Sequence, residues 1–337
     1  MVTRKAFTVA VVGATGAVGK EMMTLLVERR FPVKELRLFA SDRSAGKWAK
    51  FGNRRVQLKP LSPGCFEGVH FALFAVSSEL ARQWAPRAVS EGATVIDNSS
   101  AYRMDPEIPL VVPEVNGHRI PRPRRPGIIA NPNCTAAILL MALKPLHEAA
   151  GLTRVIVSTY QASSGAGAEG MAELEAQLRG WAQGKKVPAK VFPHPLAFNV
   201  IPHIDVFKEN GFTGEEMKVA QEARKILELP GLKVTATCVR VPVLRAHSES
   251  VYVETARKVT VEEARKRFAA FPGLEVIDDV RRKAYPLPRT QGGKDACAVG
   301  RIREDLHTPN ALNFWVVGDQ LRKGAALNAV QIAEKLL

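Results

Sequence analysis

Two features that many chains have are missing from this one: clustered cysteines and a long apolar run. Its four cysteines, Cys65, Cys134, Cys238 and Cys297, are scattered, with no C-x-x-C pair and no Cys/His spacing of the kind that binds zinc. This pattern predicts reduced thiols and no metal. No apolar run approaches the ~18 residues that span a membrane, and the first residues lack the apolar core of a signal peptide. A cytoplasmic protein without a membrane partner is the simplest interpretation.

What is present is the composition of an ordinary globular protein. The chain has 337 residues, of which 46% are hydrophobic and 24% charged. That length predicts two domains, each with a sizeable core. There is no internal repeat and no low-complexity segment. Lysine and arginine number 48 against 33 aspartates and glutamates, so the formal net charge is +15.

The basic surplus is compatible with nucleic acid, with anionic small molecules, or simply with a basic surface. Its densest part is the run that holds Arg119, Arg122, Arg124 and Arg125, which is also rich in proline. No nucleic-acid-binding motif accompanies this run. We therefore interpret it as a solvated loop and predict no nucleic-acid partner.

A strand, a glycine-rich turn and a helix follow one another near the start of the chain. Residues 7–12 form a continuous apolar run, as expected for a strand buried in a parallel sheet, and residues 20–29 show helical periodicity. The turn is spaced G-x-x-G-x-x-G, a departure from G-x-G-x-x-G. This order predicts a dinucleotide site with the pyrophosphate at the helix N-terminus; the alternative is a tight turn without a ligand. The residues of the turn are Gly13, Ala14, Thr15, Gly16, Ala17 and Val18.

The end of the second predicted strand, residues 36–40, bears on the choice of cofactor. In doubly wound sheets this strand end meets the adenosine ribose, where an acidic residue suits a free 2′-hydroxyl and an arginine suits a 2′-phosphate. Both types follow, in Ser41-Asp42-Arg43-Ser44. The guanidinium and the two hydroxyls favour NADP over NAD, with a merely solvated arginine as the alternative.

Further alternation of strands and helices predicts a doubly wound, Rossmann-like parallel sheet. Strands are expected at residues 69–76 and 93–97, around a helix at 79–91 that Pro86 should kink or divide. Ligand groups collect at the carboxyl ends of such strands. The polar residues at these ends are Ser77, Ser78, Asn98, Ser99 and Ser100, with Arg103 close behind.

Residues 131–135, Asn-Pro-Asn-Cys-Thr, join a short β-prone run at 127–130 to an apolar helix. The proline keeps the chain extended before it, and Asn133 is a favourable helix N-cap. Cys134 therefore falls in the first turn of a helix that meets no breaker before Pro145. The positive end of the helix dipole favours thiolate over thiol there, which makes Cys134 a candidate nucleophile. A small buried thiol is the alternative.

After this helix the pattern becomes that of an α+β domain with a mainly antiparallel sheet and helices on one face. A small-residue loop at 162–167 lets a ligand or another backbone approach closely. The last helix, 324–337, is expected to return to the first domain, so that the domains are 1–132 with 318–337, and 133–317. The predicted strands are 154–161, 232–243, 249–258, 298–303 and 311–317, and the predicted helices are 168–182, 214–227 and 261–271.

Four polar residues of this half carry candidate chemistry. His247 lies at a turn between two predicted strands and is a candidate for the proton carrier that a cysteine nucleophile needs, in competition with six other histidines. Arg240 lies inside a β-run, where an arginine usually has a bound anion; a structural ion pair is the alternative. Glu216 and Lys218 begin a helix and, by pattern alone, are ordinary surface charges.

Several separate segments resemble aspartate-β-semialdehyde dehydrogenases, in the order of that family and over almost the whole chain. The segments are GATGAVG at 13–19, NPNC at 131–134, YQASSGAG at 160–167, RVP at 240–242 followed by HS at 247–248, and LRKGAA at 321–326. The resemblance implies an NADP-binding domain, a catalytic and dimerisation domain, and at least a homodimer. It also implies NADPH-dependent reductive dephosphorylation of L-β-aspartyl phosphate to L-aspartate-β-semialdehyde and inorganic phosphate, on the route to lysine, threonine and methionine.

The same resemblance implies how the chemistry is divided. Cys134 would attack the acyl phosphate and become a thioester, His247 would be the acid/base, and Gln161 would orient the acyl intermediate. Besides the glycine-rich turn, the residues expected at the cofactor are Ser41, Arg43, Ser44, Ser77, Ser164, Gly165 and Gln320.

Five residues are implied in substrate binding. Arg240 would hold the substrate α-carboxylate in a bidentate pair, and Glu216 would take the α-amino group. Arg103, Asn133 and Lys218 would hold the phosphate.

One position departs from the family pattern, and two other functions remain open. Gln320 stands where related sequences commonly have asparagine near the nicotinamide, which leaves the cofactor contact in doubt. N-acetyl-glutamyl-phosphate reductase performs the same chemistry on a longer acyl phosphate, but its cysteine usually sits in a Gly-Cys-Tyr-Pro-Thr setting. A basic nucleotide-binding module without catalysis is the alternative from another class.

Overall fold

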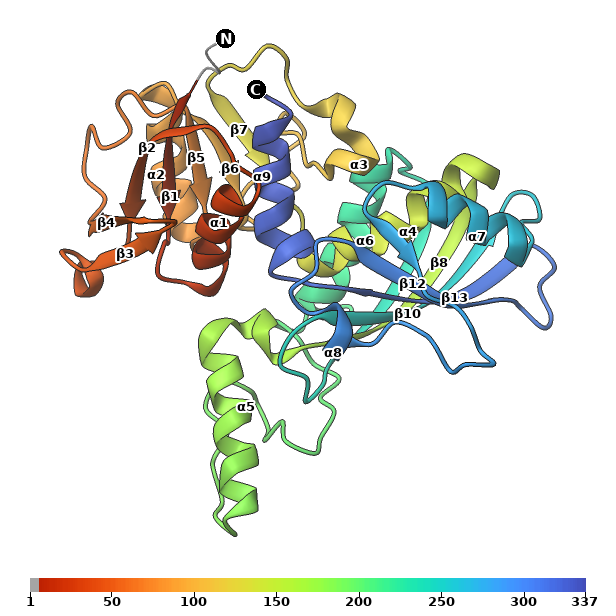
Figure 1. Cartoon of the computed structure of the whole chain (residues 1–337). Coiled ribbons are helices and arrows are strands. Elements are labelled where there is room, and N and C mark those ends of the chain that lie inside the picture. Colours follow the sequence, from red (N-terminus) through yellow and green to blue (C-terminus); the bar gives the residue numbers. More distant parts are fainter. Residues whose placement is uncertain (1–5) are drawn as a thin grey trace. The chain divides into compact units, whose positions relative to one another are not determined.

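The computed structural model describes residues 6–337, which divide into two compact units (Figure 1). One unit ends at Asn133 and resumes from Ala325 to Leu337, and the other is Cys134–Gly324. The sequence placed these boundaries at 132/133 and 317/318.

The first unit is built on a seven-stranded sheet in the order β3-β4-β2-β1-β5-β6-β7. All neighbouring strands are parallel except β3 and β4, which confirms the doubly wound parallel sheet. The hairpin β3–β4 is largely exposed and has no apolar run that would predict it. The strands are β1 (Phe7–Val12), β2 (Val33–Phe39), β3 (Trp48–Phe51), β4 (Arg54–Lys59), β5 (Phe71–Phe74), β6 (Thr94–Asp97) and β7 (Gly127–Ala130).

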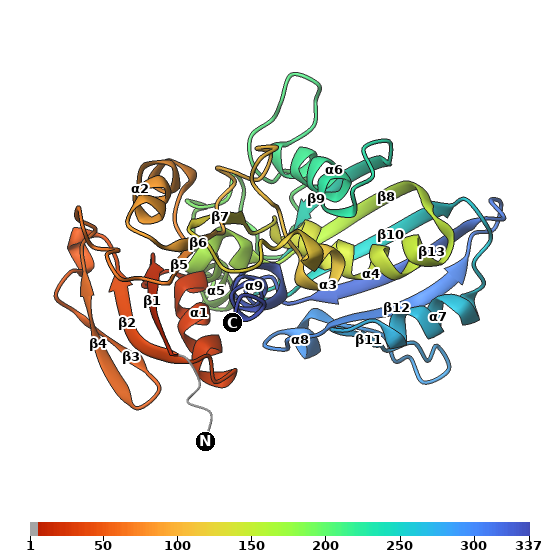
Figure 2. The ribbon, with the colours of Figure 1, turned by 90° about the horizontal axis from the view of Figure 1, so that it is seen from above.

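Helices cover both faces of this sheet (Figure 2). On one face, α1 (Ala17–Glu28) and α9 (Leu327–Glu334) form a core with strand residues such as Val11. On the other face, α2 (Ser78–Ser90) forms a second core with residues such as Val12. Because successive strand residues point to opposite faces, a strand covered on both sides is apolar throughout, as β1 is.

Two prolines lie inside helices that continue past them. α2 is unbroken over Pro86, and α4 (Cys134–Ala150) is unbroken over Pro145. Of the two predicted effects of Pro86, a kink or a division of the helix, the division does not occur. The helix after Cys134 extends further than its proline suggested. A proline in a helix interior costs about 3 kcal/mol. Burial of neighbours such as Ala85 and Leu146 offsets that cost.

The second unit is built on a six-stranded sheet in the order β11-β12-β13-β10-β8-β9. The four central strands are antiparallel, and the two edge strands β11 and β9 are parallel to their neighbours, so the sheet is mainly antiparallel, as predicted. The strands are β8 (Leu152–Gln161), β9 (Lys233–Arg240), β10 (His247–Thr255), β11 (Leu274–Val276), β12 (Cys297–Glu304) and β13 (Ala311–Gly318).

Three helices of this unit, α4, α6 (Gly214–Leu227) and α7 (Val261–Ala270), lie along one face of the second sheet (Figure 1). Helix α5 (Gly167–Ala182) stands away from that sheet, and α8 (Pro288–Gln291) is a single turn beside β13. None of the helices within residues 6–337 combines the length and the apolar character needed to cross a bilayer.

Strand register brings three of the candidate residues to one edge of the second sheet. β8 ends at Gln161, which is paired with Arg240 at the end of the parallel strand β9. The antiparallel strand β10 begins at His247, and its next residue pairs with Tyr160 of β8. Side chains that are far apart in sequence therefore meet at a common edge.

The glycine-rich turn depends on a very close backbone approach, which a substitution can test. Gly13 has φ +86°, and a Cβ added there would lie 2.2 Å from the carbonyl oxygen of Ala75. Gly92 has φ +98° but would meet nothing within 4 Å. We expect Gly92→Ala to cost about 1–2 kcal/mol of stability from backbone strain. Gly13→Ala should cost a further ~1–3 kcal/mol from overpacking, measured by urea unfolding. Equal unfolding midpoints would contradict this close approach.

Candidate functional site

Cys134 and His247 contact each other in the second unit. α4 begins at Cys134, which confirms that the thiol lies in the first helical turn, and β10 begins at His247. Cys134 Sγ lies 3.5 Å from His247 Nε2. Cys134 is partly exposed, whereas His247 is fully buried. The thiol can therefore be reached from outside while its histidine partner is held inside the protein.

A backbone hydrogen bond decides which ring nitrogen of His247 carries the proton. The N–H group of Ala162 donates to His247 Nδ1 at 3.0 Å. Because a backbone N–H can only donate, Nδ1 is an acceptor and the neutral ring is protonated on Nε2, the atom that faces Cys134. Burial lowers the pKa of His247 well below its usual value, and the charge of Arg240 lowers it further. His247 is thus a neutral hydrogen-bond donor toward the sulfur at neutral pH.

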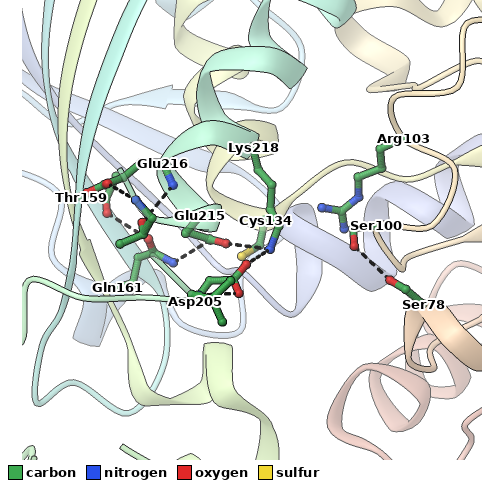
Figure 3. Close-up of polar contacts among 12 residues, drawn as sticks. Ser78, Ser100, Arg103, Cys134, Thr159, Gln161, Asp205, Glu215, Glu216 and Lys218 are labelled. Carbon is green, nitrogen blue, oxygen red and sulfur yellow. Dashed lines mark hydrogen bonds and ion pairs between the residues drawn. The ribbon is translucent and has the colours of Figure 1, made fainter. Parts of the chain in front are cut away.

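The amide of Gln161 is held at both ends (Figure 3). Thr159 Oγ1 donates to Gln161 Oε1 at 2.9 Å, and Gln161 Nε2 donates to Glu215 Oε1 at 3.1 Å. All three side chains are buried. The orientation of the amide group is therefore set by a hydroxyl on its own strand and a carboxylate on α6.

Arg240 is buried beside the same loop. Its Nη1 donates to the carbonyl oxygen of Ala162 at 2.6 Å, and its guanidinium carbon lies 5.8 Å from the centre of the Phe192 ring. A Cβ added at Gly165 would lie 2.6 Å from Arg240 Nη1, so a side chain there would displace the guanidinium from its present position. Burial lowers the pKa of Arg240, and the charge of Glu215 opposes that effect. The guanidinium thus contacts a carbonyl oxygen and an aromatic ring, an arrangement that suits an anionic ligand.

The structure gives Glu216 a structural position, contrary to its expected role. Its Oε2 accepts from the backbone N–H of Thr213 at 2.7 Å, and Thr213 Oγ1 accepts from the N–H of Glu216, which completes a capping box at the start of α6. Its Oε1 accepts from the N–H of Cys238 at 3.0 Å. Both carboxylate oxygens are engaged by the backbone. The spacing Thr-x-x-Glu is the signature of a capping box and could have indicated this outcome from sequence.

The neighbouring Glu215 is the acidic residue that the sequence interpretation missed. It is buried, accepts the Gln161 hydrogen bond, and lies 3.5 Å from Lys218 Nζ (Figure 3). Residues three apart share a helix face, so the i,i+3 spacing of Glu215 and Lys218 was the available signal. Lys218 Nζ also contacts Asp205 Oδ2 at 2.6 Å. Lys218 thus lies between two carboxylates, of which Asp205 was also missed.

In the first unit, Arg103 is held against the segment that leads to Asn133. Its Nε donates to the carbonyl oxygen of Asn131 at 3.0 Å, and its Nη2 donates to that of Asn98 at 2.7 Å. Arg103 and Asn133 are both buried. Ser78 and Ser100 contact each other at 2.9 Å at the same strand ends (Figure 3). Arg103 is therefore anchored to the backbone two residues before Asn133, within the same unit.

The glycine-rich turn has the features of a dinucleotide site. Helix α1 starts after Gly16, which offers no side chain to cap it, and its first turn has no acidic residue. Its free N–H groups and dipole therefore favour an anion. Arg43 and Ser44 lie in a short helical turn, Asp42–Ser44, after β2. A cavity of about 290 Å³ opens at the ends of β1, β2 and β5, lined by Gly13, Ser41, Asp42, Val76, Leu80 and Trp84. These residues fit an adenine dinucleotide.

Two of the serines expected at the cofactor have local partners. Ser77 Oγ accepts from the N–H of Leu80 at 3.3 Å and so caps α2. Ser164 Oγ accepts from Gln320 Nε2, and Gln320 Oε1 accepts from the N–H of Ala246 at 2.8 Å. The glutamine that departs from the family pattern thus bridges two loops of the second unit. No group of three His, Cys, Asp or Glu side chains in residues 6–337 is arranged to bind a metal ion.

Comparison with known proteins identifies relatives along the whole chain. Residues 8–122 match the family model "Semialdehyde dehydrogenase, NAD binding domain", and residues 143–323 match "Semialdehyde dehydrogenase, dimerisation domain". The chain is similar to the aspartate-semialdehyde dehydrogenase of Aquifex aeolicus, with 49% identity over 98% of both chains. It is similar to that of Bacillus subtilis, with 47% identity over 97% of this chain and 96% of the relative.

Solved structures of aspartate-semialdehyde dehydrogenases are also similar to this chain. Aspartate semialdehyde dehydrogenase II of Vibrio cholerae, complexed with ASA, matches with a TM-score of 0.95 and 45% identity over 98% of both chains. The aspartate semialdehyde dehydrogenase of Candida albicans with NADP matches with a TM-score of 0.77 and 26% identity, again over 98% of both chains.

The surroundings of the cysteines predict which thiol reacts. Burial raises the pKa of Cys65 and Cys238, and Cys238 and Cys297 are fully buried. Cys134 is partly exposed and faces a hydrogen-bond donor. We expect one equivalent of iodoacetamide at neutral pH to label Cys134 in preference to the other three, as measured by peptide mass spectrometry. Preferential labelling of any other cysteine would contradict this assignment.

Proposed function

Because the chain belongs to the aspartate-semialdehyde dehydrogenase family, whose members are phosphorylating aldehyde dehydrogenases, we propose that it converts L-β-aspartyl phosphate to L-aspartate-β-semialdehyde and phosphate with NADPH. This reaction belongs to the route to lysine, threonine and methionine. The observation that carries the proposal is the 3.5 Å contact between Cys134 Sγ and His247 Nε2, next to buried Gln161, Glu215 and Arg240.

Cys134 is the nucleophile of this proposal. Its thiolate attacks the acyl carbon, the bond to the phosphate oxygen breaks, and the chain carries a thioester on Sγ. When bound, the reduced nicotinamide supplies a hydride to that carbon. The bond from Sγ to the carbon then breaks, which releases the aldehyde and restores the thiolate. The first turn of α4 stabilises the thiolate through its N–H groups and dipole.

His247 was expected as the acid/base, and in the steps of this proposal it acts as a hydrogen-bond donor through the proton that it holds on Nε2. In the resting site this N–H donates to the Cys134 thiolate. After attack, the negative charge moves to the oxygen of the acyl carbon, and the same N–H stabilises it. The hydrogen bond from Ala162 keeps the ring from turning. Gln161 presents its amide on the same strand edge and orients the acyl group.

Recognition of the amino-acid part of the substrate falls to Arg240 and Glu215. Arg240 offers a buried guanidinium that suits the α-carboxylate. Glu215 offers a carboxylate to the α-ammonium group, in place of Glu216, whose oxygens are engaged by the backbone. Arg103, Asn133 and Lys218 are proposed to hold the phosphate.

The proposed cofactor is NADP. The pyrophosphate would lie on the first turn of α1, at Gly13, Ala14, Thr15, Gly16, Ala17 and Val18. Ser41, Arg43 and Ser44 would hold the 2′-phosphate, because they follow the end of β2. Ser77, Ser164, Gly165 and Gln320 are assigned to the rest of the dinucleotide.

We propose further that the protein is a homodimer or a larger homo-oligomer. The family model that matches residues 143–323 is named a dimerisation domain. The second sheet has helices along one face, while its other face exposes Ile156 and Tyr160. An apolar sheet face of this kind is typical of subunit contacts.

One assay tests the reaction. We expect NADP reduction by L-aspartate-β-semialdehyde to require inorganic phosphate, because phosphate must release the acyl group from Cys134 in this direction. Cys134→Ala should abolish turnover but bind NADPH as the wild type does, measured by fluorescence titration. Activity only with the N-acetyl-glutamyl substrate would refute the substrate assignment. Turnover unaffected by Cys134→Ala would refute the mechanism.

Two adjacent glutamates provide a matched pair of variants. We expect Glu215→Gln to lower kcat/KM for aspartate semialdehyde by about 10- to 100-fold, because a charge-assisted hydrogen bond contributes ~1.5–3 kcal/mol. Glu216→Gln should keep most of this activity and lower stability by ~1 kcal/mol through the weakened capping box. Steady-state kinetics and thermal unfolding measure the two effects. The reverse pattern would return the ammonium contact to Glu216.

A second pair of variants tests the cofactor assignment. Arg43→Ala should raise the apparent constant for NADPH by about 10-fold or more, because the guanidinium pairs with the 2′-phosphate, and should leave that for NADH nearly unchanged. Arg54→Ala, on the exposed strand β4, is the control and should change neither constant. Equal effects of Arg43→Ala on both cofactors would contradict the phosphate contact.

A further inference from the structure

Asp319 is a buried carboxylate that collects hydrogen bonds from three separate segments of the second unit. Its Oδ2 accepts from Arg245 Nε and from the N–H of Gly293, both at 2.5 Å. Its Oδ1 accepts from the N–H groups of Leu321 and Arg322, at 2.9 and 3.1 Å. One charged side chain therefore ties together the chain before β10, the loop after α8 and the chain after β13.

The next residue along repeats this connection. Gln320 Oε1 accepts from the N–H of Ala246, the residue after Arg245. Two consecutive residues that follow β13 are thus bonded to two consecutive residues that precede β10. The last backbone pair of these strands is His247 with Gly318. Side-chain hydrogen bonds therefore connect the same two chain segments for two residues beyond the point where the backbone ladder ends.

The backbone at Ala246 shows why this continuation matters. Ala246 has φ +74°, a conformation that costs a residue with a Cβ about 1–2 kcal/mol. Such a conformation persists only where the surroundings impose it. Ala246 immediately precedes His247, so its φ sets the direction from which the His247 ring enters the site. We call the Asp319–Arg245 and Gln320–Ala246 contacts the clamp. Gln320 also bonds Ser164, in the loop assigned to the cofactor.

We propose that Asp319 is a positioning residue: its ion pair with Arg245, together with the Gln320–Ala246 bond, holds His247 against Cys134 and holds Gln320 at the cofactor loop. The inference rests on the proposed function for the meaning of the site. Asp319 touches none of the reacting groups itself. It acts through Ala246 on one side and through Gln320 on the other. One carboxylate therefore fixes the positions of both His247 and Gln320.

The protein contains a second ion pair that serves as a matched control. In the Arg245–Asp319 pair, the side chains are 31% and 0% exposed. In the Arg265–Asp278 pair, they are 44% and 1% exposed, and Asp278 also accepts from a backbone N–H, that of Arg301. Both aspartates are thus buried carboxylates under a partly exposed arginine. Asp278 bonds Arg265 and Arg301, which belong neither to the clamp nor to the site.

The test compares Asp319→Asn with Asp278→Asn in the full-length protein. The first readout is the rate of Cys134 alkylation by iodoacetamide between pH 5 and 9, without substrate or cofactor. We expect Asp319→Asn to slow alkylation at pH 7 at least about fivefold and to move its pH profile upward, because a displaced His247 no longer donates to the thiolate. Asp278→Asn should leave the alkylation rate within about twofold of the wild type and should leave the pH profile in place.

The second readout is steady-state kinetics, where Asp319→Asn should lower kcat and also raise KM for NADP through Gln320, and Asp278→Asn should do neither. If Asp319→Asn does not fold, Arg245→Gln removes the same pair from its exposed side and should give the same two changes. Alkylation rates and kinetics equal to those of Asp278→Asn would overturn the inference. Because alkylation needs no substrate, a failure of the proposed reaction leaves that readout intact and is recognised separately.

Discussion

The site depends on the backbone of one residue, Ala162. Its N–H donates to His247 Nδ1 and its carbonyl oxygen accepts from Arg240 Nη1, so a single residue orients both the imidazole ring and the buried guanidinium. The first bond fixes the tautomer of the ring and leaves Nε2–H for Cys134. A side chain with rotamer freedom could not fix the orientation of both partners, whereas a buried backbone group at the end of a strand can.

Electrostatics reinforce this arrangement along two rows of residues that run across the sheet. In the row at the sheet edge, Arg240 supplies a buried positive charge beside Gln161. In the row behind it, Glu249 pairs with Thr159, and Thr159 pairs with Cys238. Burial raises the pKa of both Glu249 and Cys238, which favours the neutral form of each. In that form neither group opposes a negative charge in the first row.

The fold and the helical position of Cys134 could be predicted from the sequence to a large extent. The apolar run before Gly13 and the Asn-Pro-Asn run before Cys134 are local signals, and local signals predict strand ends and helix starts well. Glu215 was missed because no local signal distinguishes it from Glu216. Both glutamates open the same helix, and only the packing of α6 against β9 shows which one turns to Gln161. The outcome at Pro86 likewise depends on packing, because buried neighbours keep that helix whole.

The sequence by itself determined the main strands and helices, though not the β3–β4 hairpin or the short strand β11. It also determined the glycine-rich turn and the position of Cys134 in the first turn of a helix, because these features depend on neighbours within a few residues. Only the tertiary structure decided the tautomer of His247, the contact of Glu215 with Gln161, and the clamp from Asp319 to Arg245. These depend on contacts between residues more than fifty positions apart. Such contacts are fixed by strand register and burial, which pair residues that no local pattern relates.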